Sequence, residues 1–100
     1  MPDRLTTASF SPHINQKFFV HIEGNEPLEL ELIEVAKAGA APENPQYRQA
    51  FSVVFVGPAQ PMLPQRIYRV EHEAMGALDL FLVPLGPDRA GRMRYETVFA

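Results

Sequence analysis

The sequence of 100 residues contains no cysteine and no long apolar run. The lack of cysteine excludes disulfide bonds, thiolate catalysis and cysteine-ligated zinc. No apolar stretch approaches the roughly 20 residues that a membrane-spanning helix needs, and the first residues lack the charged and apolar regions of a signal peptide. We therefore expect a soluble cytoplasmic protein without a membrane span.

An excess of one charge is also missing. Nine Lys and Arg residues stand against twelve Asp and Glu residues, for a net charge of −3, so nothing favours binding to the phosphate backbone of a nucleic acid. No Walker-type glycine loop and no G-x-G-x-x-G motif is present. The apolar share of 46% and the charged share of 21% are ordinary for a folded domain. One compact domain over residues 1–100 is expected.

Proline, by contrast, is abundant. The ten prolines are roughly twice the usual share of about 5%, and they are spread along the chain, which disfavours a helical bundle. Between these breaks, apolar and polar residues alternate with the period of a β-strand. The predicted strands are residues 17–23, 28–35, 49–56, 66–72, 78–83 and 92–99. Six short strands joined by Gly/Pro turns predict an all-β fold of antiparallel strands, in a small barrel or a sandwich.

The segments outside the strands have their own signals. Residues 1–16 are polar and mixed, and we expect them to pack on the domain through a short helical turn near residues 6–10, with Phe10 as the anchor. Residues 36–46 form the longest expected loop. In the second strand, Leu32 and Ile33 stand side by side. Either a bulge shifts the phase there, or that half of the strand is covered on both faces.

The candidate catalytic residues are weakly supported. His72 lies between Glu71 and Glu73, but neighbouring side chains of a strand point to opposite faces. We therefore expect His72 to form hydrogen bonds in a half-buried layer and the two glutamates to be solvated. Ser52 lies in mid-strand and not in a G-x-S-x-G turn. The sequence thus predicts no catalytic site, no metal and no cofactor; a metal-dependent hydrolase built on His72 and the acidic pairs is an alternative.

A second apolar face is the most informative feature. One strand face carries enough large side chains to fill a small barrel, and the opposite face still carries eight more: Phe19, Ile33, Val35, Val54, Val56, Phe81, Val83 and Val98. Leaving them in water would forgo on the order of 10–20 kcal/mol, which is large beside a typical net stability of about 5–15 kcal/mol. Loops of the chain, the second layer of a sandwich, or a partner could cover this face. The predicted partner-binding residues are Phe19, Val54, Val56, Phe81 and Val83.

A ligand-binding barrel is a further alternative. Tyr68, His72 and Tyr95 would then be polar groups in an apolar cavity. Six strands leave little room for a ligand, because about eight are typical of barrels that hold one small molecule.

The fourth and fifth predicted strands carry a resemblance, in Leu63-Pro64-Gln65, Ile67-Tyr68, His72, Gly76 and Leu80-Phe81-Leu82-Val83-Pro84. These residues resemble a small bacterial domain family of unknown function, and the likeness extends from about Phe18 to Phe99. Arg66 departs from it, since a small residue is expected there. The family is often encoded beside phage-tail-collar-like proteins, which implies a structural or assembly role and brings no catalytic residues.

The leading hypothesis is therefore a non-enzymatic structural or interaction module of a bacterial or phage-derived assembly. It would contact a protein partner, or copies of itself in a homo-oligomer, through the second apolar face and an exposed strand edge.

Overall fold

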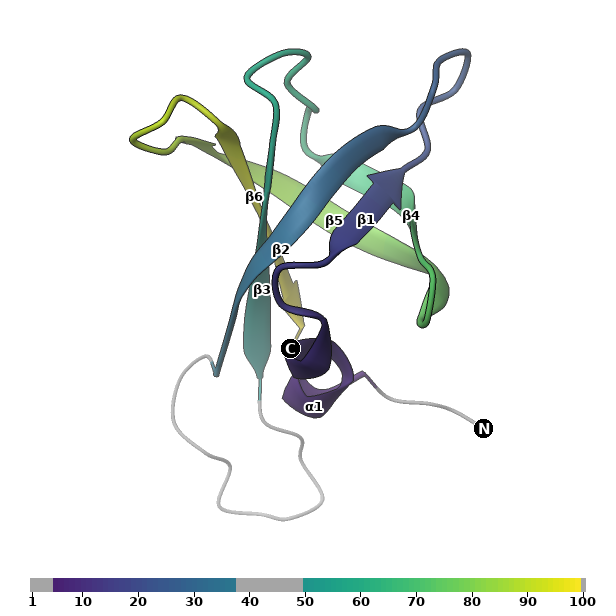
Figure 1. Ribbon diagram of the computed structural model, residues 1–100, viewed down its shortest axis with the longest axis vertical. Helices are drawn as coiled ribbons and strands as arrows, with labels where there is room; N and C mark the ends of the chain where they lie inside the picture. Colours follow the sequence, from purple (N-terminus) through teal and green to yellow (C-terminus); the bar gives the residue numbers. More distant parts are fainter. Residues whose placement is uncertain (1–4, 38–49, 100) are drawn as a thin grey trace.

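The computed structural model describes residues 5–37 and 50–99 (Figure 1). Its elements are α1 (Thr7–Phe10), the 3-10 turn η1 (Ser11–His13), β1 (Lys17–Val20), β2 (Leu28–Lys37), β3 (Phe51–Gly57), β4 (Arg66–His72), β5 (Gly76–Pro87) and β6 (Met93–Phe99). Among these residues, no helix has the length and apolar character needed to cross a membrane.

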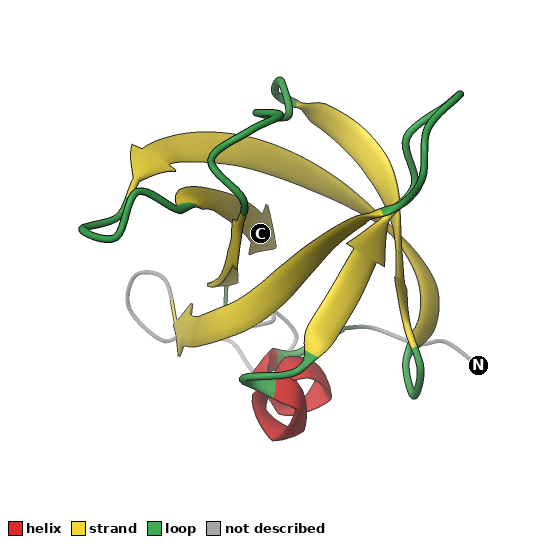
Figure 2. Ribbon diagram, turned by 45° about the horizontal axis from the view of Figure 1, so that its top comes forward, coloured by secondary structure: helices red, strands yellow, loops and turns green. Residues whose placement is uncertain are grey.

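The strands form a closed barrel in the order β1-β2-β3-β6-β5-β4, and neighbouring strands are antiparallel. Figure 2 shows the strands curving around a common interior. The predicted all-β class and the six antiparallel strands are confirmed, and of the two expected architectures the barrel is the one observed. Closure gives every strand two neighbours, so the exposed edge expected from the sequence is reduced to short overhangs at strand ends.

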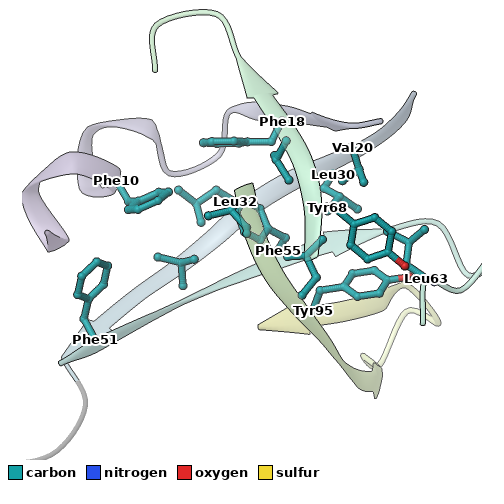
Figure 3. Close-up of a cluster of buried hydrophobic side chains, with 14 residues drawn as sticks. Phe10, Phe18, Val20, Leu30, Leu32, Phe51, Phe55, Leu63, Tyr68 and Tyr95 are labelled. Carbon is teal, nitrogen blue, oxygen red and sulfur yellow. Dashed lines mark hydrogen bonds between the residues drawn. The ribbon is translucent and has the colours of Figure 1, made fainter. Parts of the chain in front are cut away.

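The barrel interior is filled by the strand face that the alternation predicts. Its buried side chains are Phe18, Val20, Leu30, Leu32, Phe51, Val53, Phe55, Tyr68, Val70, Leu80, Leu82 and Tyr95, joined by Phe10 and Leu63 from outside the strands. Figure 3 shows this cluster packed between the strands. Full burial of one large apolar side chain is worth about 1.5–3 kcal/mol, so this interior supplies the main stabilisation of the fold.

A bulge in β2 resolves the two adjacent apolar residues. The register between β2 and β3 shifts between Leu32 and Glu34, which gives Ile33 no direct partner on β3. After the bulge the phase is reversed, so Val35 packs against the core. The prediction that placed Val35 on the outer face is therefore wrong, and the bulge is the reason.

The ends of β1 and β5 differ most from prediction. β1 ends at Val20, because the backbone of Ile22 already accepts a turn hydrogen bond from Asn25 (3.0 Å). β5 continues through Pro84 to Pro87, although proline was expected to end it. The last residue of β5 that pairs with β4 is Leu82, and proline is tolerated in a strand where one side has no partner.

The loop segments were predicted with mixed success. The helical turn and the burial of Phe10 are confirmed. Residues 36 and 37 belong to β2 and not to the expected loop. The rest of that loop, and the predicted start of the third strand at Gln49, lie outside the described residues.

Candidate functional site

Three exposed apolar side chains lie together on the outside of β4, β5 and β6. Ile67 on β4 is directly opposite Phe81 on β5, and their exposed fractions are 66% and 45%. On β6, Val98 is 58% exposed and follows Thr97, whose hydroxyl reaches the backbone oxygen of Phe81. We call Ile67, Phe81 and Val98 the outer apolar patch.

Alternation within the strands holds this patch outward. Phe81 lies between Leu80 and Leu82, which are both buried in the barrel, so its ring cannot turn inward without displacing the core. On β6, the buried Thr97 donates its Oγ1 hydrogen to the backbone oxygen of Phe81 (3.0 Å). This bond fixes β6 against β5 at the level of the patch.

The predicted contact residues on β3 are already covered by the chain itself. Val54 and Val56 are buried, although they point away from the barrel interior. Val54 lies between Glu34 on β2 and Glu96 on β6, and Val56 likewise has charged residues on both neighbouring strands. The aliphatic parts of long charged side chains can cover apolar surface. Val54 and Val56 therefore offer little surface to a partner, contrary to what the alternation implied.

Phe19 and Val83 are the other members of the predicted set. Val83 is half-buried and faces Glu96 across the β5–β6 ladder. Phe19, 41% exposed, lies on β1 between glutamates of β2 and β4. Polar pairs separate Phe19 from the outer apolar patch: His21 contacts Glu71 at 2.9 Å, and Arg69 of β4 and Asp79 of β5 are paired in the next row.

The two tyrosines of the ligand-binding alternative hold a loop. The backbone N–H of Leu63 donates to the hydroxyl of Tyr95 (2.9 Å), and the hydroxyl of Tyr68 donates to the backbone oxygen of Pro64 (2.7 Å). Figure 3 shows both rings directed toward Leu63. These hydroxyls fasten the segment between β3 and β4 to one end of the barrel and are not turned toward an open cavity.

His72 is separate from the tyrosines and ends β4. Its Nδ1 accepts hydrogen bonds from the backbone N–H groups of Ala74 (3.0 Å) and Met75 (3.1 Å). The ring proton therefore lies on Nε2, which donates to Oε1 of Gln16 (2.7 Å). The same Gln16 oxygen lies 2.9 Å from Nδ1 of His13. The predicted hydrogen bonding of His72 is confirmed, but the residue is almost fully buried and not half-buried.

The electrostatic setting of His72 favours the neutral ring. Burial, and secondly the nearby His13, lower the pKa of His72 below its ordinary value, while Glu73 acts in the opposite direction. Glu71 and Glu73 are exposed, as expected. Within the part of the chain that the structure describes, no three His, Asp or Glu side chains are grouped so that they could hold a metal ion.

Sequence reasoning missed two features of these sites. Ile67 was not assigned to the second apolar face, although it alternates with the inward-facing Tyr68 and could have been found by that signal. The contacts of His72 with His13 and Gln16 had no such signal, because these residues precede β1, where strand periodicity does not apply.

Comparison with known proteins adds one relationship. A family described as "Domain of unknown function (DUF6916)" matches residues 5–99. No curated protein and no solved structure matches the chain.

Proposed function

The chain belongs to this family of unknown function, and we propose that it is a non-enzymatic interaction module that associates with a second copy of itself through the outer apolar patch. The observation that carries the proposal is the cross-strand pair of Ile67 and Phe81, both large, apolar and exposed. Such a module suits the bacterial or phage-derived assembly that the sequence resemblance implies.

The physical reason lies in the continuity of the patch. Single apolar side chains on a surface are normal, whereas contiguous ones mark interaction sites. Ile67 and Phe81 are directly opposite each other, and Val98 on β6 follows Thr97, which is hydrogen-bonded to the backbone of Phe81. Because the underlying strands are fixed in a closed barrel, the chain cannot bury these side chains by a small rearrangement. A second molecule can bury them by docking on this face.

The charges next to the patch favour an identical partner. Arg69 on β4 and Asp79 on β5 occupy the row adjacent to Ile67 and Phe81, with Nε and Oδ1 3.7 Å apart. In a two-fold symmetric dimer, the same surface meets itself, so Arg69 of each copy can face Asp79 of the other. A partner surface of a single charge sign would repel one of the two residues.

The closed barrel favours contact through this face over strand addition. Strand addition requires a free backbone edge, and the strands of this barrel have a neighbour on both sides except at short overhangs, such as residues 83–87 of β5. The proposed contact is therefore made by side chains on the outer surface of β4, β5 and β6.

The test is sedimentation of the purified protein over a range of concentrations. We expect the wild-type chain to dimerise and the Phe81→Asp variant to stay monomeric, with its folding stability lowered far less than its association. The control is Phe19→Asp, which changes the same residue type at nearly the same exposure but outside the patch, and which should dimerise like the wild type. A wild-type protein that stays monomeric at high concentration, or equal loss of dimer in both variants, would contradict the proposal.

A charge exchange tests whether the partner is an identical copy. Arg69→Asp alone and Asp79→Arg alone should each weaken dimerisation, because like charges then meet twice across the two-fold axis. Mixing the two variants should restore a dimer, since every contact between the unlike chains again joins opposite charges. If the mixture associates no better than either variant alone, the two-fold arrangement is wrong.

A further inference from the structure

We propose that His72 is a pH-sensitive latch, which holds the N-terminal segment (residues 5–16) on the barrel at neutral pH and releases it on mild acidification. The inference is independent of the outer apolar patch. It rests on the contacts that join His72 to the turn after β4 on one side and to Gln16 on the other.

The hydrogen bonds of His72 allow only one protonation state. Nδ1 accepts from the backbone N–H groups of Ala74 and Met75, while Nε2–H donates to Gln16. A second proton could bind only at Nδ1, where it would face two N–H hydrogens and break both bonds. The backbone N–H groups of Ala74 and Met75, in the turn between β4 and β5, would lose their acceptor. The charged ring would be left without a partner at Nδ1.

The surroundings of the ring also disfavour a cation. The ring of His72 lies between those of Phe18 (4.5 Å) and His13 (4.4 Å), and the residue is 6% exposed. The titratable groups whose charges act on it are His13 from η1 and Glu73 from the turn, while Lys17 and Glu71 line the hollows beside it. Lys17 is paired with Glu29 (2.8 Å), and Glu73 is exposed to water. A charged His72 ring is therefore stable only after it has turned out toward solvent.

Outward movement of His72 would loosen the N-terminal segment through Gln16. The Gln16 side chain accepts from His72, and its backbone oxygen accepts from the N–H of Leu32 (3.1 Å) on β2. The N–H of Asn15 donates to the oxygen of Leu32 (2.7 Å). These two backbone bonds join the segment to β2 beside the histidine. Loss of the His72 contact thus removes the side-chain support next to both of them.

The test is amide hydrogen exchange of the full chain at about pH 7.5 and about pH 5.5, the range in which histidines titrate. After correction for the intrinsic pH dependence of exchange, we expect the amides of Asn15 and Leu32 to lose protection at the lower pH. Amides in the centre of β3, such as those of Val53 and Phe55, should keep theirs. If β3 loses protection in parallel, the whole barrel is unfolding and the latch is wrong.

Two variants identify the responsible histidine. His72→Asn places a carboxamide oxygen where it can accept the turn N–H groups and cannot be protonated, so protection at Asn15 should become independent of pH. The control is His21→Asn, at an exposed histidine outside the barrel, which should behave like the wild type. A pH response that survives in His72→Asn overturns the proposal. Should that variant not fold, the ring signals of wild-type His72 provide the test: they must titrate with the same midpoint as the Asn15 amide, and different midpoints would contradict the latch.

Discussion

The two ends of the barrel are closed by segments that lie outside the strands, but the polar groups that hold them differ. At one end, the segment between β3 and β4 is held by the hydroxyls of Tyr68 and Tyr95. At the other end lies the N-terminal segment with α1 (Figure 1), which inserts Phe10 and is held by the imidazole of His72. A tyrosine hydroxyl keeps its proton at neutral pH, whereas histidine titrates close to it. The hydrogen bonds that close the tyrosine end are therefore unchanged near neutral pH, whereas those of His72 depend on pH in that range.

The aromatic contacts at the N-terminal end show how strongly it is packed. The ring of Phe10 is fully buried and lies 6.2 Å from Phe51 and 5.6 Å from Phe99, between ring centroids, while Phe51 and Phe99 stack at 4.6 Å. Most of the stability of this end comes from apolar contact, so the His72 contact controls the part of the segment next to it, at Asn15 and Gln16, while Phe10 supplies most of the attachment.

The largest effect is expected from Phe10→Ala. Removing a fully buried phenylalanine ring costs about 3–5 kcal/mol, and the free energy of unfolding in urea should fall by that amount. The control is Met62→Ala at the opposite end, where the side chain is exposed; this change should stay within about 0.5 kcal/mol of wild type. Equal losses in the two variants would mean that Phe10 is not the main anchor of its end.

An intermediate effect is expected from Tyr95→Phe. The variant keeps the ring but leaves the buried N–H of Leu63 without its acceptor, which costs about 1–3 kcal/mol. Tyr68→Phe is the matched comparison. It frees a backbone oxygen on the exposed Pro64, which water can reach, so its cost should be smaller, about 0.5–1.5 kcal/mol. A larger loss for Tyr68→Phe than for Tyr95→Phe would reverse this assignment.

The smallest change is the dependence of stability on pH, and it should have opposite signs at the two ends. The pKa of His72 is lowered from 6.5, chiefly by burial. The neutral ring therefore adds to the free energy of unfolding above pH 6.5, and this stabilisation is lost as the pH falls through the pKa of His72 in the folded protein. The pKa of Tyr68 is raised from 10.0, again chiefly by burial. The stabilisation that the protonated hydroxyl gives is therefore lost only as the pH rises above 10.0. Urea unfolding across this range should show a loss of stability on the acid side that His72→Asn removes.

The sequence predicts the interior of this barrel better than its exterior. Alternation identifies Phe18, Leu30 and Phe55 as core residues, because a strand interior has a strict period of two. The doublet of Leu32 and Ile33 also predicts the bulge as one of two alternatives. The exterior depends on which strands become neighbours. Val54 is covered and Phe81 is exposed because their cross-strand partners differ, and strand order cannot be obtained from local periodicity.

The candidate sites follow the same division. Phe81 was predicted as an exposed contact from its strand alone, whereas its proximity to Ile67 and Val98 required the pairing of β4, β5 and β6. The sequence predicts a half-buried His72, and the structure shows that the residue is almost fully buried. Its contact with Gln16 joins residues 56 positions apart, and no motif connects them.

The extension of β5 beyond β4 bears on how the protein avoids forming fibres. Residues 83–87 have no partner on β4, and an overhang of this kind is a place where chains can stack edge to edge. Pro84 and Pro87 lie within it, and neither has an N–H group to offer an incoming strand. Pro84 and Pro87 therefore leave this overhang with fewer N–H groups for an incoming strand, and we expect their replacement by β-branched residues to increase aggregation.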